Sequence, residues 1–103
     1  MEQVVQNQDY LNYKNMETNN YGYHTKAIEK GVLGEFSKIR EEFEELEDAY
    51  KQNDKIMMLC ELSDLIGAIK HFTNTITACT VSLDDLIAFN KKTEQAFKNG
   101  QRK

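Results

Sequence analysis

The chain has 103 residues, enough for one domain, and its 17 acidic and 13 basic residues give a net charge of −4. This balance argues against a general nucleic-acid-binding protein, because such domains usually carry a strong excess of basic residues. Apolar residues make up 40 %, proline is absent and glycine occurs only five times. A modest helical core is therefore favoured over a sandwich or barrel with many tight turns.

The cysteines and the apolar runs indicate where such a chain would reside. Cys60 and Cys79 lie 19 positions apart without a CxxC or Cys/His cluster, so neither a zinc site nor a disulfide framework is predicted. No apolar run reaches the roughly 18 residues of a membrane span. The polar start MEQVVQNQDY has no signal-peptide pattern. We therefore expect a cytoplasmic protein that associates with neither membranes nor nucleic acids.

The first strong helical pattern follows a polar N-terminal segment, residues 1–23, which is rich in Asn and Gln. From about Glu35 to Gln52, apolar side chains recur at steps of three and four, which predicts an amphipathic helix. These side chains are Phe36, Ile39, Phe43, Leu46 and Tyr50. Asn53 and Asp54 then predict a short turn, and so short a connection implies antiparallel neighbours.

The second predicted helix, from about Lys55 to Ala78, is apolar on nearly every side. A helix that is apolar all round is buried all round. Two neighbouring helices are too few to cover it. We therefore expect a second chain to complete the bundle, in a homodimer or homotetramer.

A third helix is predicted to begin after Ser82, because residues 82–85 (SLDD) have a capping-box pattern. It should end near Asn99, where Gly100 can stop it, and residues 98–103 form a basic tail. The sequence thus predicts a single all-α domain. Its architecture is an antiparallel helical hairpin plus a C-terminal helix, with the bundle completed by oligomerisation.

Two pairs of acids lie on the predicted hairpin, each spaced three positions apart: Glu42 with Glu45, and Glu61 with Asp64. The first pair belongs to a run of six acids in residues 41–48, which by itself is typical of a solvated face. The second pair lies in the most apolar helix, where an uncompensated carboxylate is costly. No basic residue of that helix lies three or four positions from either acid. The second pair therefore requires a cation or strong hydrogen-bond donors.

The hairpin offers a way to bring the two pairs together. Its turn, at residues 53–54, falls almost midway between Glu45 and Glu61. The two pairs therefore lie at a similar distance from the turn along the hairpin and can converge. Four carboxylates with no histidine or cysteine among them suit a hard cation, Mg²⁺ or Mn²⁺. The alternative is a buried acid network held by Lys38, Arg40 and a partner chain.

An ExxE motif, a short turn and an ExxD motif on two antiparallel helices resemble the MazG-like, all-α nucleoside triphosphate pyrophosphohydrolases. Residues 41–49 (EEFEELEDA) resemble the acidic helix of that family. Residues 61–66 (ELSDLI) resemble its E-L-x-D segment, with Ser63 where glycine is common. The stretch 81–92 resembles the last helix of the family, but the usual Lys-xxx-Asn arrangement is not clearly matched. The likeness covers about residues 31–97.

The resemblance implies hydrolysis of a nucleoside or deoxynucleoside triphosphate between its α and β phosphates, which gives a nucleoside monophosphate and pyrophosphate. It implies that Glu42, Glu45, Glu61 and Asp64 are ligands of Mg²⁺, with Mn²⁺ as a possible substitute. Either Glu42 or Glu45 would also orient the attacking water. The other interpretation is a non-catalytic helical module that binds nucleotides or a protein partner on the same scaffold.

Three lysines are candidates for contacts with the triphosphate. Lys38 lies one turn before Glu42 on the same face, so it can reach a phosphate or instead form an i,i+4 pair with Glu42. Lys92 and Lys98 belong to the basic stretch 91–103 and lie within the predicted C-terminal helix, which makes them better candidates than the last residues of the tail.

Rings near the expected site are candidates for contacts with the rest of the substrate. Tyr23, together with Tyr21 and His24, leads into the first helix and can provide a surface on which a base stacks. Ordinary packing of these rings is the alternative. His71 shares a face with Asp64, so it is expected either to touch the substrate or to pack beside the core.

Overall fold

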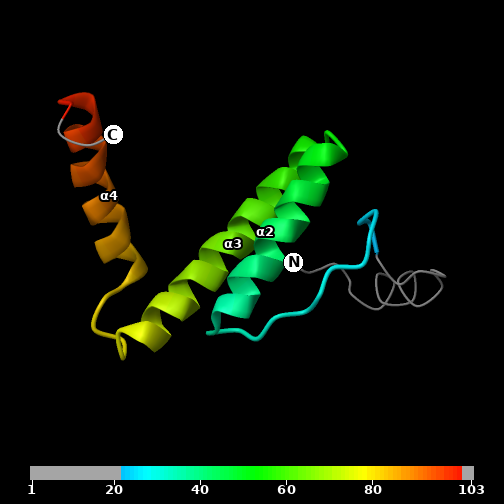
Figure 1. Cartoon of the computed structure of the whole chain (residues 1–103), viewed down its shortest axis with the longest axis horizontal. Helices are drawn as coiled ribbons and strands as arrows, with labels where there is room; N and C mark the ends of the chain where they lie inside the picture. The colour runs from blue at the N-terminus through cyan, green and yellow to red at the C-terminus, as the bar shows by residue number, and fades with distance from the viewer. Residues whose placement is uncertain (1–21, 101–103) are drawn as a thin grey trace.

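A computed structural model of the chain describes residues 22–100. In that range the chain forms three helices and no strand: α2 (Phe36–Lys51), α3 (Lys55–Ile76) and α4 (Leu83–Lys98) (Figure 1). The all-α prediction is confirmed, and each helix ends within two residues of its expected limits. None of these described helices has both the length and the apolar character needed to cross a membrane.

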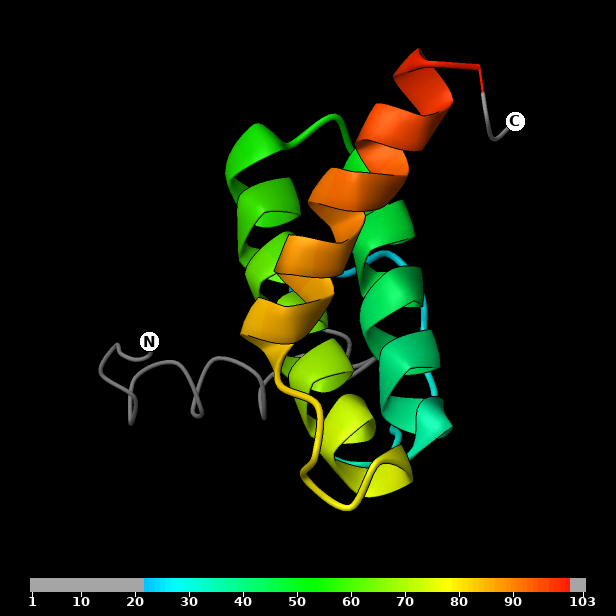
Figure 2. The same ribbon diagram turned by 90° about the vertical axis from the view of Figure 1, so that its left-hand side faces the viewer.

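Helices α2 and α3 lie side by side as an antiparallel hairpin, as two perpendicular views show (Figures 1 and 2). The predicted turn is present. Asn53 adopts a left-handed conformation with φ of 57°, which asparagine tolerates better than most residues. Asp54 then caps α3, because its side chain accepts a hydrogen bond of 3.0 Å from the backbone N–H of Met57. The turn chemistry therefore sets the register of the hairpin.

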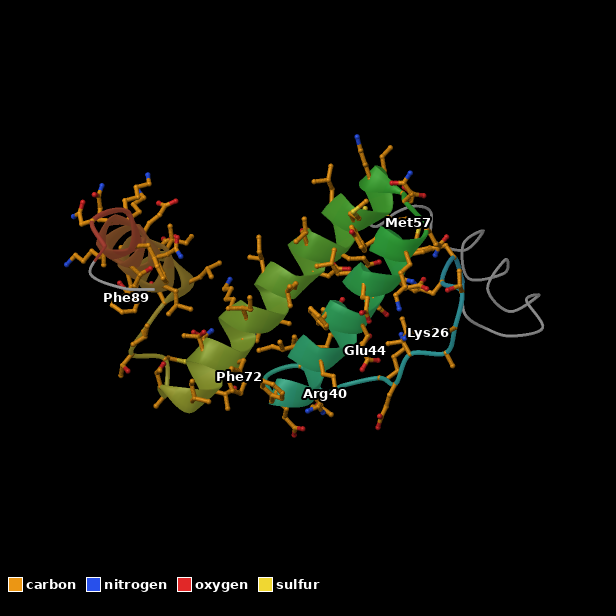
Figure 3. The ribbon with its side chains drawn as sticks, turned by 45° about the horizontal axis from the view of Figure 1, so that its top comes forward. Lys26, Arg40, Glu44, Met57, Phe72 and Phe89 are labelled. Atoms are coloured by element: carbon orange, nitrogen blue, oxygen red, sulfur yellow. The ribbon has the colours of Figure 1, made fainter. Side chains whose placement is uncertain are left out.

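Aromatic contacts link the other end of the hairpin, where α2 begins and α3 approaches its end. The ring of Phe36 meets that of Phe72 edge-on, with centroids 5.9 Å apart. The guanidinium of Arg40 lies over the Phe36 ring, 5.2 Å from its centroid. Arg40 and Phe72 lie at the same end of the hairpin (Figure 3). These contacts hold the two helices together at the end opposite the turn.

Helix α4 is capped as predicted but stands apart from α2. The Ser82 hydroxyl accepts a hydrogen bond from the Asp85 N–H at 3.1 Å, and the Asp85 carboxylate accepts one from the Ser82 N–H at 2.9 Å. The helix ends before Gly100, which adopts a φ of 79°. Among the described helices, α4 contacts only α3 (Figure 1).

The interior of the hairpin is acidic rather than apolar. Among the described residues, Ala49 and Ala68 are the buried apolar side chains. The buried polar residues are Glu41, Glu42, Asp48, Glu61 and Thr73. By contrast, Ile56, Leu59 and Ile66 of α3 are each more than half exposed, at 75 %, 66 % and 52 %. The helix expected to be buried all round is thus uncovered in a single chain, and its burial by a second copy stays a prediction.

Residues 22–35, here called the N-terminal strap, pass along the hairpin without regular helix or strand structure (Figure 1). The strap approaches α2 most closely at Gly31, where an added Cβ would overlap the backbone of Ser37 and Lys38. The Gly31 N–H also donates a hydrogen bond of 2.8 Å to the Glu41 carboxylate. A residue without a side chain is therefore required at this position.

Replacing Gly31 by alanine should destabilise the protein by about 1–3 kcal/mol, the range typical of overpacking. The control is Gly67→Ala in the middle of α3, where a Cβ meets no atom within 4 Å. Better helix propensity should make that variant more stable by about 0.5–1 kcal/mol. Urea unfolding of both variants measures the difference. Wild-type stability in Gly31→Ala would show that the strap does not lie against α2.

Candidate metal centre

The two predicted acid pairs meet between α2 and α3. One carboxylate oxygen from each of Glu42, Glu45, Glu61 and Asp64 can be chosen so that all four lie within 4.8 Å of one another. The predicted convergence is confirmed, and these four side chains are here called the carboxylate cluster. Glu42 and Glu61 are buried, Glu45 is half-buried and Asp64 is exposed. The cluster therefore meets solvent at Asp64.

Two oxygens of the carboxylate cluster lack a partner among the described residues when all four acids are ionised. They are the buried Oε1 atoms of Glu42 and Glu61, for which residues 22–100 then supply no hydrogen-bond donor. Buried carboxylate oxygens are costly to leave unpaired, and native structures rarely do so. The cluster thus fits a group that brings positive charge between the helices, such as a hard divalent cation.

The proton affinity of the cluster reflects the same shortage of positive charge. Burial raises the pKa of the Glu45 carboxyl, and the carboxylates of Glu42 and Glu61 raise it further, to about 9. Burial also raises the pKa of Asp64, and the charge of Glu42 adds to this effect. Near neutral pH, Glu45 therefore holds a proton that a cation would displace.

Asp48 is a buried acid of the same helix that does have partners. Its carboxylate accepts hydrogen bonds from the Thr25 N–H at 3.1 Å, from the Thr25 hydroxyl and from the Gln52 amide at 2.8 Å. It also lies 2.9 Å from Nδ1 of His24. Burial opposes the charged form, but the hydrogen bonds from Thr25 and His24 outweigh it and lower the pKa of Asp48 to about 2. Asp48 is therefore an ionised anchor for the strap.

Glu41 anchors the strap at a second point. Its carboxylate accepts the Gly31 N–H at 2.8 Å and lies 3.1 Å from the Lys38 ammonium and 3.6 Å from that of Lys30. Burial opposes its charge, but the Gly31 N–H and Lys38 outweigh that effect and lower the pKa of Glu41. The solvated face that is typical of such acidic runs thus describes only part of residues 41–48. The spacing of the acids in residues 41–48 does not distinguish those that are buried from those that are exposed.

Lys38 lies at the edge of the carboxylate cluster. Its ammonium is 3.0 Å from the Glu42 carboxylate, so the i,i+4 pair considered from the sequence is formed. Burial lowers the pKa of Lys38, but the contacts with Glu42 and Glu41 outweigh this and raise it. Arg40, the other base of the proposed acid network, lies over Phe36 instead. Lys38 is thus the base from that network that contacts the buried acids.

Tyr23 contacts the carboxylate cluster directly, while its role in base stacking stays a prediction. Its hydroxyl donates a hydrogen bond of 2.7 Å to Oε2 of Glu61, and its ring centroid lies 4.5 Å from that of His24. The residue therefore orients a carboxylate of the cluster. Tyr21, considered with it from the sequence, lies outside the described residues.

The other predicted substrate contacts are not brought to the cluster. His71 is exposed on α3, and Lys92 and Lys98 are exposed on α4, which does not contact α2. Within the described part of the chain, none of these three side chains makes a hydrogen bond or ion pair with the carboxylate cluster. Their roles in substrate binding stay predictions.

Comparisons of the chain with protein-family models, curated proteins and solved structures found no match. The resemblance to the MazG-like family therefore stays a prediction that rests on the acid motifs. The function has to be argued from the carboxylate cluster and its surroundings.

The raised pKa of Glu45 predicts how stability changes with pH in the absence of metal. Between its ordinary pKa of 4.5 and about 9, the folded state holds a proton that the unfolded state has lost. Because the folded state then binds more protons, the free energy of unfolding should fall as pH rises through this window. Urea unfolding in EDTA at several pH values measures the slope.

The variant Glu45→Gln removes this titration while it keeps the shape of the side chain. Its slope between pH 5 and 9 should be shallower than that of the wild type, although the shifted Asp64 still contributes in the same direction. Equal slopes in the two proteins would show that Glu45 is ionised in the folded protein at neutral pH.

Proposed function

We propose that the protein hydrolyses nucleoside or deoxynucleoside triphosphates to a nucleoside monophosphate and pyrophosphate. Mg²⁺, or Mn²⁺ in its place, would be held by the carboxylate cluster. The observation that supports the metal is the pair of buried, unpartnered oxygens on Glu42 and Glu61. The resemblance of residues 41–49 and 61–66 to MazG-like pyrophosphohydrolases supports the reaction.

The residues around the cluster have the chemistry that this reaction needs. When bound, Mg²⁺ neutralises a triphosphate and stabilises the charge that develops on its oxygens. The oxygen of a water would attack one of the two phosphorus atoms on either side of the α–β bridging oxygen, and the bridging bond would break to release the monophosphate and pyrophosphate. The proton of the water would pass to the carboxylate of Glu42, or to that of Glu45 once a cation has displaced the proton that Glu45 holds. Lys38, which is 26 % exposed, is placed to turn from Glu42 towards a phosphate oxygen. Tyr23 holds Glu61 in position through its hydroxyl.

We also propose that the working unit contains two or more copies of the chain, as a homodimer or homotetramer. The support is the row of exposed apolar side chains on α3, which includes Ile56, Leu59 and Ile66. Large apolar patches of this kind are rare on monomers. Helix α4, which contacts only α3 among the described helices, leaves these apolar side chains of α3 exposed.

The reaction is tested by incubating the protein with each common NTP and dNTP, with and without Mg²⁺, and separating the products by chromatography. We expect a nucleoside monophosphate and pyrophosphate in equal amounts, and only when the metal is present. The absence of turnover across the whole panel would contradict the proposal and favour the non-catalytic binding module.

The role of the cluster is tested with Glu61→Gln, which keeps the shape of the side chain and removes its charge. Changes to groups that merely orient metal ligands typically cost about 10–100-fold in activity or affinity. Loss of a ligand charge should therefore lower kcat/KM by about 100-fold or more. The matched control is Glu47→Gln on the acidic helix, where Glu47 pairs only loosely with Lys51, at 4.0 Å. Full activity in Glu61→Gln would show that Glu61 is not a ligand of the metal.

A further inference from the structure

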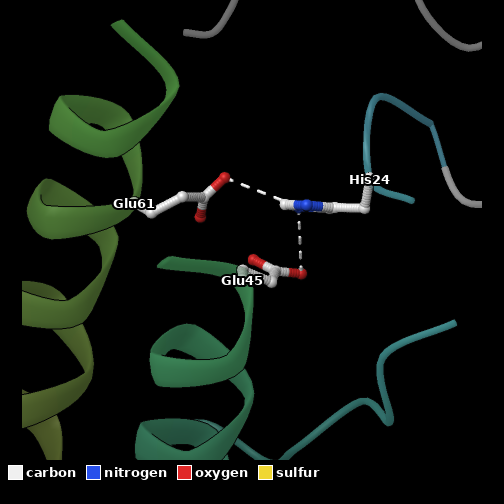
Figure 4. Close-up of side chains that lie close together, drawn as sticks. All are labelled: His24, Glu45 and Glu61. Atoms are coloured by element: carbon white, nitrogen blue, oxygen red, sulfur yellow. Dashed lines mark ion pairs between the residues drawn. The ribbon is translucent and has the colours of Figure 1, made fainter. Parts of the chain in front are cut away.

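The strap brings a histidine against carboxylates from both helices of the hairpin (Figure 4). Nε2 of His24 lies 3.9 Å from Oε2 of Glu45 on α2 and 3.6 Å from Oε2 of Glu61 on α3. The His24 side chain is only 10 % exposed. These three residues offer one nitrogen and two carboxylates that face a common point.

The other ring nitrogen of His24 is held by Asp48. Nδ1 lies 2.9 Å from Oδ2 of Asp48, an oxygen that also accepts hydrogen bonds from the Thr25 N–H and the Gln52 amide and so acts as an acceptor here. Nδ1 must then carry the hydrogen, which fixes the ring and directs Nε2 towards Glu45 and Glu61. A carboxylate that holds one nitrogen while the other faces an ion is the usual support of a histidine metal ligand.

The two distances from Nε2 fit shared ligation better than direct hydrogen bonds. N–H···O hydrogen bonds span about 2.7–3.2 Å, and both separations are longer than this. Two ligand atoms that each lie about 2.1 Å from one ion stand about 3.0–3.4 Å apart. Small side-chain movements would bring Nε2 and the two oxygens to that spacing. Oε2 of Glu61 also accepts the Tyr23 hydroxyl at 2.7 Å, and its second lone pair is left for an ion. The other oxygen of this fully buried carboxylate, Oε1, has no partner among the described residues.

We propose that His24, Glu45 and Glu61 bind a divalent transition-metal ion, with Zn²⁺ as the representative, beside the position proposed for Mg²⁺. Imidazole nitrogen and carboxylate oxygen are both ligand types that bind zinc, and three such ligands leave a fourth tetrahedral position open. Mg²⁺ prefers oxygen ligands, so the imidazole selects against it. This site shares Glu45 and Glu61 with the carboxylate cluster but does not require that the protein hydrolyse nucleotides.

Calorimetric titration of the full chain with Zn²⁺, and separately with Mg²⁺, tests the site. The exposed thiols of Cys60 and Cys79 are first replaced by serine, because thiolates also bind zinc. His24→Ala should weaken Zn²⁺ binding at least about 10-fold, while Mg²⁺ binding stays within about threefold. The matched control is His71→Ala, the other histidine, which is exposed on α3 and should change neither affinity.

The outcomes separate this proposal from the proposed function. Unchanged Zn²⁺ affinity in folded His24→Ala overturns the histidine site, whereas failure of the parent protein to bind Mg²⁺ contradicts the hydrolase instead. If His24→Ala does not fold by circular dichroism, the histidine nitrogen resonances of the parent protein decide. The Nε2 resonance of His24 should move on addition of Zn²⁺ while those of His71 stay in place. No movement for His24 contradicts the site.

Discussion

The constraint on which this structure depends is the burial of several carboxylates between two helices. Glu61 is fully buried in the most apolar helix of the chain, opposite acids of α2. The buried apolar residues among those described, Ala49 and Ala68, are too small to separate the helices. Small residues at a helix contact allow close approach, so the acidic side chains are brought together. Buried negative charge is costly unless it is neutralised, and the described residues neutralise it only in part.

The strap compensates some of the buried acids and leaves others uncompensated. Glu41 and Asp48 each receive backbone and side-chain hydrogen bonds, and the pKa of each is lowered. Glu42 and Glu61 each keep an unpartnered oxygen within the described residues, and Glu45 between them has a raised pKa. Acids with partners and acids without them thus lie within one short stretch of the hairpin, and the acids without partners favour a cation between the helices. A purely structural acid network would be expected to satisfy the middle of the cluster as well as its ends.

The sequence predicted the features that follow from local rules. Helix limits follow from the apolar period and from the caps at Asp54 and Ser82, and the meeting of the acid pairs follows from the position of the turn. The strap has no such period. Its path depends on single contacts between distant positions, as when Tyr23 reaches Glu61 across 38 residues. Periodicity could not predict that His24 would face the carboxylates.

The apolar surface of α3 shows a second limit. A pattern of apolar residues on every side predicts that a helix is buried, but it does not say by what. In a single chain, Ile56 and Leu59 are exposed. Helix α3 thus combines a buried acid, Glu61, on the side that faces α2 with exposed apolar side chains elsewhere on its surface. The cation and the second copy of the chain that we propose would neutralise the first and cover the second.

The most direct test of the account is a crystal structure of the protein grown with Mn²⁺, with anomalous scattering recorded at the manganese edge. We expect an anomalous peak from a bound manganese ion that lies between the carboxylates of Glu42, Glu45, Glu61 and Asp64. A well-ordered cluster with no peak, or manganese bound only elsewhere, would contradict the claim that these buried acids exist to hold a divalent cation.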